Sequence, residues 1–152
     1  MKAMQGTEVH HPKALASEVF TNMLRTSGHL AHQQSMLLKR FGLSRTQFDA
    51  LRILRNLDED GTPILEVANR MITRVPDITR LIDRLEQDGL VQRLSSKRDR
   101  RVVLVKIEDK ARELLDQVDG PLLSLTGGQI EHLSADELQT LNSLLLKVRC
   151  PA

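Results

Sequence analysis

Apolar residues recur at the three-to-four-residue spacing of a helix along most of this chain. The first such segment spans residues 13–40, and Gly42 is expected to end it. The next helix is predicted to begin at Ser44. Ser44 and Gln47 match the capping box, in which each side chain bonds the other residue's free backbone amide.

Two short helical patterns follow in the middle of the chain. Thr62 and Pro63 are typical of an N-cap and a first helical position, and they precede a helix over Ile64–Met71. A turn over residues 72–75 leads to a second helix, Pro76–Glu86, whose proline lies in the first turn, where a missing N–H does no harm.

Two β-rich runs come next, Leu90–Leu94 and Val102–Ile107, joined by a polar and cationic loop over residues 95–101. A helix-turn-helix followed by a hairpin is the element order of a winged helix-turn-helix. The predicted fold class is therefore mostly α with a small β-hairpin wing. Such a fold offers one DNA duplex two contacts: a helix for the major groove and a loop that reaches the minor groove.

The C-terminal third is again helical in pattern. One helix is predicted over residues 108–119, and Gly120–Pro121 is expected to kink or interrupt it before it resumes over residues 122–132. A second capping box, Ser134 with Glu137, predicts the start of a last helix.

Composition limits what this fold can do. The 152 residues favour a single domain, and the lack of Trp and Tyr requires an aliphatic core. Aromatic platforms for single-stranded bases are nearly absent, which favours double-stranded DNA. Residues 70–106 carry ten Lys and Arg against five Asp and Glu, whereas the remainder carries twelve against fifteen. A cationic middle between acidic ends predicts a local phosphate-binding surface.

Other function classes find no support in the sequence. The single cysteine, Cys150, excludes an internal disulfide and a CxxC metal knuckle. No segment resembles a signal peptide or an apolar membrane span, so a cytoplasmic protein without membrane contact is expected. No catalytic constellation or Gly-rich phosphate loop is present, so we expect neither an enzyme nor a cofactor.

The chain resembles the multiple antibiotic resistance regulator (MarR) family of winged helix-turn-helix transcription regulators. The resemblance covers roughly residues 13–149, and its most specific part fixes the spacing across helix, strand and wing. The matching motifs are Ser44-x-x-Gln47-x-x-x-Leu51, Leu65-x-x-Ala68, Thr79-Arg80-Leu81-x-Asp83-Arg84-Leu85-Glu86-x-x-Gly89-Leu90-Val91-x-Arg93 and Asp99-x-Arg101.

The resemblance implies one MarR-like domain over residues 1–152. Residues 13–42 and 108–149 would form dimerisation helices around a winged DNA-binding lobe over residues 43–107. It also implies a homodimeric repressor on a palindromic operator, released by a small ligand. An aliphatic interface is expected from residues beyond the needs of one small lobe: Leu15, Val19, Leu38, Leu122, Leu138, Leu141, Leu144 and Leu145.

Two positions depart from the family pattern. Residues 107–111 lack the usual Leu-Thr-x-x-Gly turn after the wing, and Asp109 is expected near the cap of the following helix. Asp77 stands where Ser or Thr is common, and an acidic residue there favours a cytosine amino group or an arginine as its partner.

The candidate DNA-binding residues lie on the second helix and on the wing. The resemblance implies that Asp99 pairs with Arg101 and aims it into the minor groove. For Arg80 and Arg84 the alternative is an ion pair within the helix, with Asp77, Asp83 or Asp88. The full set is Arg74, Pro76, Asp77, Thr79, Arg80, Arg84, Ser95, Ser96, Lys97, Arg98, Asp99, Arg100 and Arg101.

Three further readings stay open. His29, His32 and His132 would make a metal-responsive regulator only with more ligands than the sequence places beside them, so no metal is expected. Cys150 would make a redox sensor, and a winged helix can also serve as a protein-interaction module. A small aromatic or anionic effector is expected near a group of cations: Arg25, Lys39, Arg40 and Arg52.

Overall fold

The computed structural model describes residues 12–57, 60–97, 99 and 101–150. The chain divides into two units, the first ending at Gln33 and the second beginning at Gln34. The wing residues Arg98 and Arg100, both candidates for DNA contact, lie outside the described residues.

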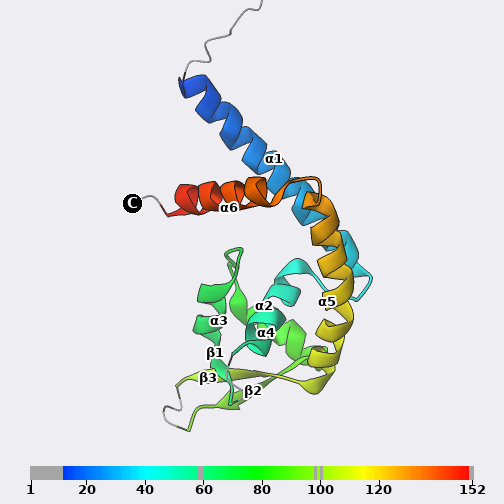
Figure 1. The fold of residues 1–152 in the computed structure, drawn as a ribbon. Helices are drawn as coiled ribbons and strands as arrows, with labels where there is room; N and C mark the ends of the chain where they lie inside the picture. Colours follow the sequence, from blue (N-terminus) through cyan, green and yellow to red (C-terminus); the bar gives the residue numbers. More distant parts are fainter. Residues whose placement is uncertain (1–11, 58–59, 98, 100, 151–152) are drawn as a thin grey trace, which may run out of the picture. The chain divides into compact units, whose positions relative to one another are not determined.

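Helices make up most of the described chain, and its strands form one small antiparallel sheet in the order β1-β3-β2 (Figure 1). In sequence order, the elements are α1 (Pro12–Lys39), α2 (Arg45–Arg55), β1 (Thr62–Pro63), α3 (Ile64–Arg70), α4 (Ile78–Gln87), β2 (Val91–Ser95), β3 (Val103–Ile107), α5 (Asp109–Ile130) and α6 (Ala135–Arg149). The predicted fold class is confirmed.

The boundary between α1 and α2 lies where the sequence predicts it. Gly42 adopts a positive φ of 72°, and the Leu43 N–H donates back to the Leu38 carbonyl at 3.1 Å, which closes the end of α1. The Ser44 hydroxyl accepts the Gln47 N–H at 3.2 Å, and the Gln47 side chain accepts the Ser44 N–H at 2.9 Å. The capping box is confirmed.

Thr62 and Pro63 do not start a helix as their residue types suggest. They form β1, in which Thr62 pairs with Val105 and Pro63 with Leu104 of β3. Pro63 has the extended dihedral angles φ −56° and ψ 135°, and α3 begins only at Ile64. The N-cap prediction is wrong because pairing with β3 holds these residues extended, and Thr62 is buried there.

Helix α4 begins two residues later than predicted, so Pro76 precedes the helix instead of lying in its first turn. Asp77 is the N-cap, and its carboxylate accepts the Arg80 backbone N–H at 3.0 Å. An acidic side chain at this position satisfies a free amide and complements the helix dipole. Gly89, with φ 70°, ends the helix and turns the chain into β2.

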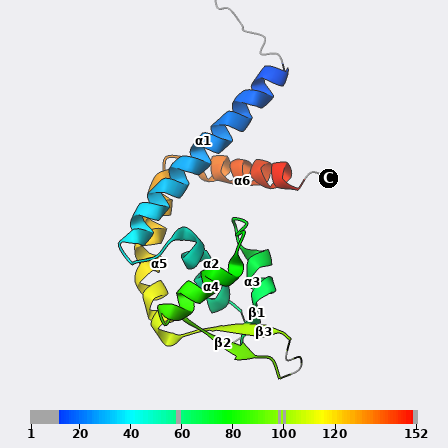
Figure 2. The ribbon, with the colours of Figure 1, turned by 180° about the vertical axis from the view of Figure 1, so that it is seen from behind.

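The hairpin of β2 and β3 agrees with the predicted strands to within one residue, and its pairing runs from Val91 with Ile107 to Ser95 with Val103 beside the loop. In Figures 1 and 2 the three strands lie along one edge of helices α2, α3 and α4. The helix-turn-helix and the wing therefore belong to one lobe.

The predicted interruption at Gly120–Pro121 is wrong, since α5 is a single helix that contains Pro121. Pro121 removes one backbone hydrogen bond and crowds the carbonyl one turn earlier, but the helix continues through it. Glu108 is the N-cap and makes no side-chain capping bond, and Asp109 lies in the first turn. The second capping box, at the start of α6, is confirmed.

The core is aliphatic, as the composition predicts. It joins α1, α2, α4 and α5 through side chains with no exposed surface: Leu38, Leu51, Ile82, Leu85 and Leu115. The expectation that Leu38 belongs to an interface between protomers is therefore wrong. Because Leu81, Ile82 and Leu85 are buried, α4 has its opposite side free.

Candidate nucleic-acid interface and adjoining cavity

The side of α4 turned away from the core carries two rows of polar residues. Thr79, Asp83 and Glu86 are spaced four and three residues apart and form one row. Arg80 and Arg84, four residues apart, form the other row and are both exposed. An acidic and a basic row thus lie side by side on one helix.

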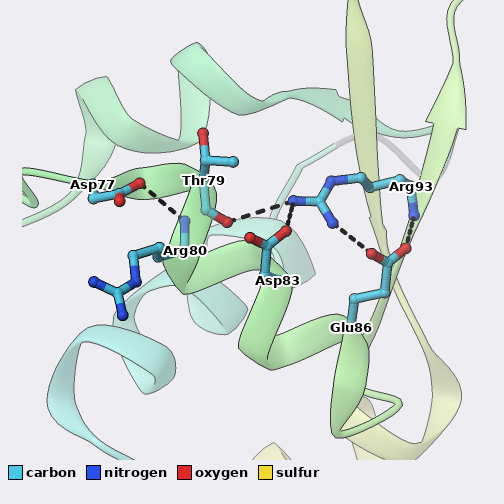
Figure 3. Close-up of polar contacts among 6 residues, drawn as sticks. All are labelled: Asp77, Thr79, Arg80, Asp83, Glu86 and Arg93. Atoms are coloured by element: carbon cyan, nitrogen blue, oxygen red, sulfur yellow. Dashed lines mark hydrogen bonds and ion pairs between the residues drawn. The ribbon is translucent and has the colours of Figure 1, made fainter.

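Arg93 of β2 reaches across to the acidic row (Figure 3). Its guanidinium donates to the Asp83 carboxylate at 2.5 Å, to the Glu86 carboxylate and to the Thr79 carbonyl at 3.4 Å. Its backbone N–H also donates to Glu86, at 3.2 Å. One strand residue therefore holds the acidic row over two turns of α4.

The charge of Arg93 is fixed by these contacts. Partial burial disfavours the charged guanidinium, but its hydrogen bonds to Asp83 and Glu86 outweigh that effect and raise the pKa of Arg93. Arg55 of α2 resembles it: its hydrogen bond to Asp119 of α5, at 2.7 Å, raises the pKa of Arg55. Both arginines remain cations throughout the physiological range.

Arg80 and Arg84 remain available for an external partner. Asp77 uses its carboxylate to cap the helix, and Asp83 is bound by Arg93. Within the described ranges, neither Arg80 nor Arg84 forms an ion pair, so the alternative of intrahelical pairs does not hold. In Figure 3 the Arg80 side chain points away from Arg93.

The wing is organised by two short polar contacts. The Ser96 hydroxyl accepts the Asp99 backbone N–H at 3.3 Å, and the Asp99 carboxylate accepts the Arg101 backbone N–H at 2.9 Å. Asp99 thus fixes the backbone at Arg101, where the resemblance implies a pair with the side chain. Ser95, Lys97, Asp99 and Arg101 are exposed, as are Arg74 and Pro76 in the loop before α4.

A cavity of about 560 Å³ lies in the second unit, between α2, α5 and the loop that leads to α4. Its apolar wall comes from Phe48, Met71, Ile72, Leu122 and Leu123. Three arginines line it, each with a partner: Arg45 with Gln34 at 3.0 Å, Arg52 with Asp49 at 3.1 Å, and Arg55 with Asp119.

Asp49 connects this cavity to the helix-turn-helix. Its side chain lines the cavity and is nearly buried, and one carboxylate oxygen accepts the Ile72 backbone N–H at 2.7 Å. The other oxygen accepts from Arg52. The loop that precedes α4 is therefore tied to a cavity-lining ion pair.

The predicted effector cations agree only in part with this cavity. Arg52 lines it, whereas Arg25, Lys39 and Arg40 are not among its lining residues. Arg45 and Arg55 were missed because Asp119, which lines the same cavity, lies 64 residues beyond Arg55 in the chain, and only the packing of α5 on α2 brings them to one wall.

The remaining candidates are exposed. His29 contacts Gln33 at 2.7 Å, and His29, His32, His132 and Cys150 all lie at the surface. In the part of the chain that the structure describes, no three His, Cys, Asp or Glu side chains come together as a metal site. Among the same residues, no helix has the length and apolarity to span a membrane.

Arg93 lies in the matching motif, but its role was not predicted from the sequence. The signal is the spacing of Thr79, Asp83 and Glu86, which puts two carboxylates on the exposed side of α4. Their partner comes from a neighbouring strand, so only the tertiary structure identifies it.

Comparison with known proteins agrees with this architecture. The model of the MarR family matches residues 43–103, from α2 to the start of β3. The MarR transcription factor from Planctomyces limnophilus is 32% identical, and the match covers 95% of this chain and 97% of that chain with a TM-score of 0.68.

Two more distant structures share the fold. MepR from S. aureus, solved in complex with DNA, is 19% identical over 85% of this chain and 95% of its own, with a TM-score of 0.76. The organohalide-sensing regulator RdhR, in its 2,4-dichlorophenol-bound form, is 20% identical over 98% of this chain and 88% of its own, with a TM-score of 0.79.

The element order, the hairpin wing and the free side of α4 define a winged helix-turn-helix protein. The chain belongs to the MarR family. It is a DNA-binding transcription regulator and not an enzyme, which sets the interaction-module reading aside.

Proposed function

We propose that this protein is a homodimeric repressor that binds a palindromic operator and leaves it when a small aromatic or anionic molecule enters the cavity. Its place of action is the cytoplasm, where its DNA lies. The observation that carries the DNA-binding part is the exposed basic row of α4, Arg80 and Arg84, which no acidic residue of the described chain neutralises.

The wing supports a second DNA contact. Lys97 and Arg101 are exposed on a turn whose backbone Ser96 and Asp99 hold in place. A cation on a fixed turn costs less conformational entropy when it enters a groove than one on a loose loop. The order of α4 and the wing along the chain suits major-groove and minor-groove contact, respectively.

Homodimerisation is supported by apolar residues that one chain leaves uncovered. No residue of α6 is buried, and α1 exposes Leu15, Val19, Phe20 and Leu24. Apolar residues exposed together on one helix mark an interaction site. A two-fold dimer would place two copies of α4 on one duplex, with half-site centres about 10 bp apart.

Ligand control is supported by the position of the cavity. Its wall includes Met71, Ile72 and Thr73, which belong to the loop that leads to α4. Arg52 is half-exposed and, within the described residues, bound only to Asp49, so an anion that attracts Arg52 would weaken the contact network that ends on the Ile72 amide. The mixed apolar and cationic lining suits an aromatic carboxylate or phenolate.

The DNA-binding part is tested by selecting duplexes from a random-sequence pool. We expect an imperfect palindrome, and Arg80→Gln should weaken binding to it by about 5- to 150-fold. The control is Arg70→Gln, which removes a cation of the same lobe that Glu66 already pairs at 2.7 Å. Equal losses in both variants would contradict the assignment of α4.

The ligand part is tested by adding phenols and aromatic carboxylates to the protein–operator complex. At least one compound should release the operator, and Arg52→Gln should reduce the ratio of operator affinity measured without and with that compound. If no compound has an effect, or if the ratio is unchanged in the variant, the cavity is not the effector site.

A further inference from the structure

We propose that Arg93 sets the charge of the DNA-facing side of α4. By binding Asp83 and Glu86, Arg93 neutralises two carboxylates on that side and leaves Arg80 and Arg84 free for phosphate or base edges. Arg93 would thus be a positioning residue for DNA binding without touching DNA itself. This inference rests on the proposed use of α4 as the reading helix.

Without Arg93, the two carboxylates on α4 would interfere with DNA binding by Arg80 and Arg84. Asp83 stands three residues after Arg80 and next to Arg84, and residues three or four apart on a helix are near enough to form ion pairs. A free Asp83 would pair with Arg80 and repel phosphate. Glu86, one turn further along the same row, would add a second negative charge.

The position and shape of the Arg93 side chain allow it to neutralise both carboxylates. Its planar guanidinium donates to both carboxylates at once, and its side chain is only 24% exposed, whereas those of Asp83 and Glu86 are 46% and 41% exposed. A lysine has a single ammonium group and lacks this fork of donors. The backbone N–H of Arg93 also binds Glu86, so the strand itself stays against the helix.

A simpler role must be distinguished from this one. The same contacts tie β2 to α4, and a residue that only tied the two elements would also weaken DNA binding when removed. The two roles differ in what happens when the carboxylates lose their charge. Asp83→Asn and Glu86→Gln keep an acceptor oxygen for hydrogen bonds but carry no negative charge.

The experiment compares four proteins on the duplex selected by the wild type and on a random-sequence duplex, each over a range of salt concentrations. They are the wild type, Arg93→Gln, Asp83→Asn with Glu86→Gln, and the triple variant. Arg93→Gln should lose about tenfold or more in operator affinity, and its salt slope should fall by about one. The triple variant should return to within about twofold of the wild type.

Arg70→Gln is the matched control. It also breaks an arginine–carboxylate pair and removes one charge from the lobe, but the freed Glu66 lies on α3. Its effect on affinity and salt slope should be smaller than that of Arg93→Gln.

The outcomes separate the ideas. If the triple variant binds as weakly as Arg93→Gln, Arg93 only holds β2 against α4 and the inference is overturned. If Arg93→Gln does not fold, the double variant decides: affinity equal to or above that of the wild type supports the inference, and weaker binding overturns it. If the wild type binds no duplex, the proposed function falls and this inference with it.

Discussion

Helices α2 and α6 begin with the same capping motif but differ in how much of their surface is buried. Each has a serine N-cap whose hydroxyl accepts a backbone amide three residues on, and each has a side chain at that position that bonds back to the serine. Six residues of α2 are buried, whereas α6 buries none. Local sequence thus fixes where both helices start, but it does not determine what covers them.

The uncovered side of α6 is ordered. Leu141, Leu144, Leu145 and Val148 are 43%, 55%, 40% and 60% exposed, and their spacing of three, one and three residues puts them on one stripe. The stripe of α2 meets the core of the same chain, whereas the stripe of α6 is exposed. A second copy of this chain is the partner that the proposed function supplies.

The largest expected effect comes from disrupting the exposed apolar stripe of α6. Leu144→Glu combined with Leu145→Glu should turn the dimer into a monomer, because two charges would have to be buried in an apolar interface. Operator affinity should then fall by on the order of 100-fold as the second half-site is lost. Sedimentation at micromolar concentration and a titration with operator duplex measure the two effects.

The control for this pair lies on the same helix. Gln139→Glu with Ser143→Glu adds the same charge to the opposite side of α6, and it should leave the protein dimeric. A wild type that sediments as a monomer would refute the dimer, and so would a dimer that survives both pairs of glutamates.

The next effect concerns α2, whose stripe is covered within the chain. Leu51 has no exposed surface, so Leu51→Ala should lower the free energy of unfolding by about 2–5 kcal/mol through lost contacts and a cavity. Leu65→Ala on α3 is the control, since Leu65 is 74% exposed and its truncation should change stability by less than about 0.5 kcal/mol. Urea denaturation measures both, and similar losses would show that burial in α2 is not what stabilises it.

The features that the sequence could predict are those set by residues close together in the chain. Capping boxes, the glycine at the end of α4 and the apolar stripe of Ile82 and Leu85 are local signals, and each is found where the pattern puts it. The exposed position of Arg80 and Arg84 follows from that stripe, because a helix that buries one side must expose the other.

What the sequence could not predict depends on contacts between distant segments. Thr62 and Pro63 are held extended by β3, about forty residues further on, against their preference for a helix start. The bonds from Arg93 to Asp83 and from the Ile72 amide to Asp49 join different segments, and no periodicity signals them. The charge on the exposed side of α4 and the composition of the cavity wall therefore depend on the tertiary structure.

The smallest expected effect distinguishes the two capping boxes by pH. The box of α6 uses a carboxylate, and hydrogen bonds from the Ser134 backbone N–H and hydroxyl lower the pKa of Glu137 below its usual 4.5. A carboxyl whose pKa is lowered by folding stabilises the protein above its unfolded pKa, and that contribution is lost as the pH falls through the folded pKa. The box of α2 uses Gln47, an amide that does not titrate.

Substituting Glu137 by Gln and Gln47 by Glu tests this difference in pH dependence. The stability difference between wild type and Glu137→Gln should be present at neutral pH and should disappear once the pH is below the folded pKa of Glu137. Gln47→Glu should create the same acid sensitivity in α2, since a carboxylate at that position also bonds the Ser44 amide and complements the helix dipole. Urea midpoints of the three proteins, measured from neutral to acid pH and compared as differences, cancel the titration of all other carboxylates. A wild type minus Glu137→Gln difference that stays constant with pH would mean that Glu137 caps α6 no better charged than neutral, so the two boxes would be equivalent.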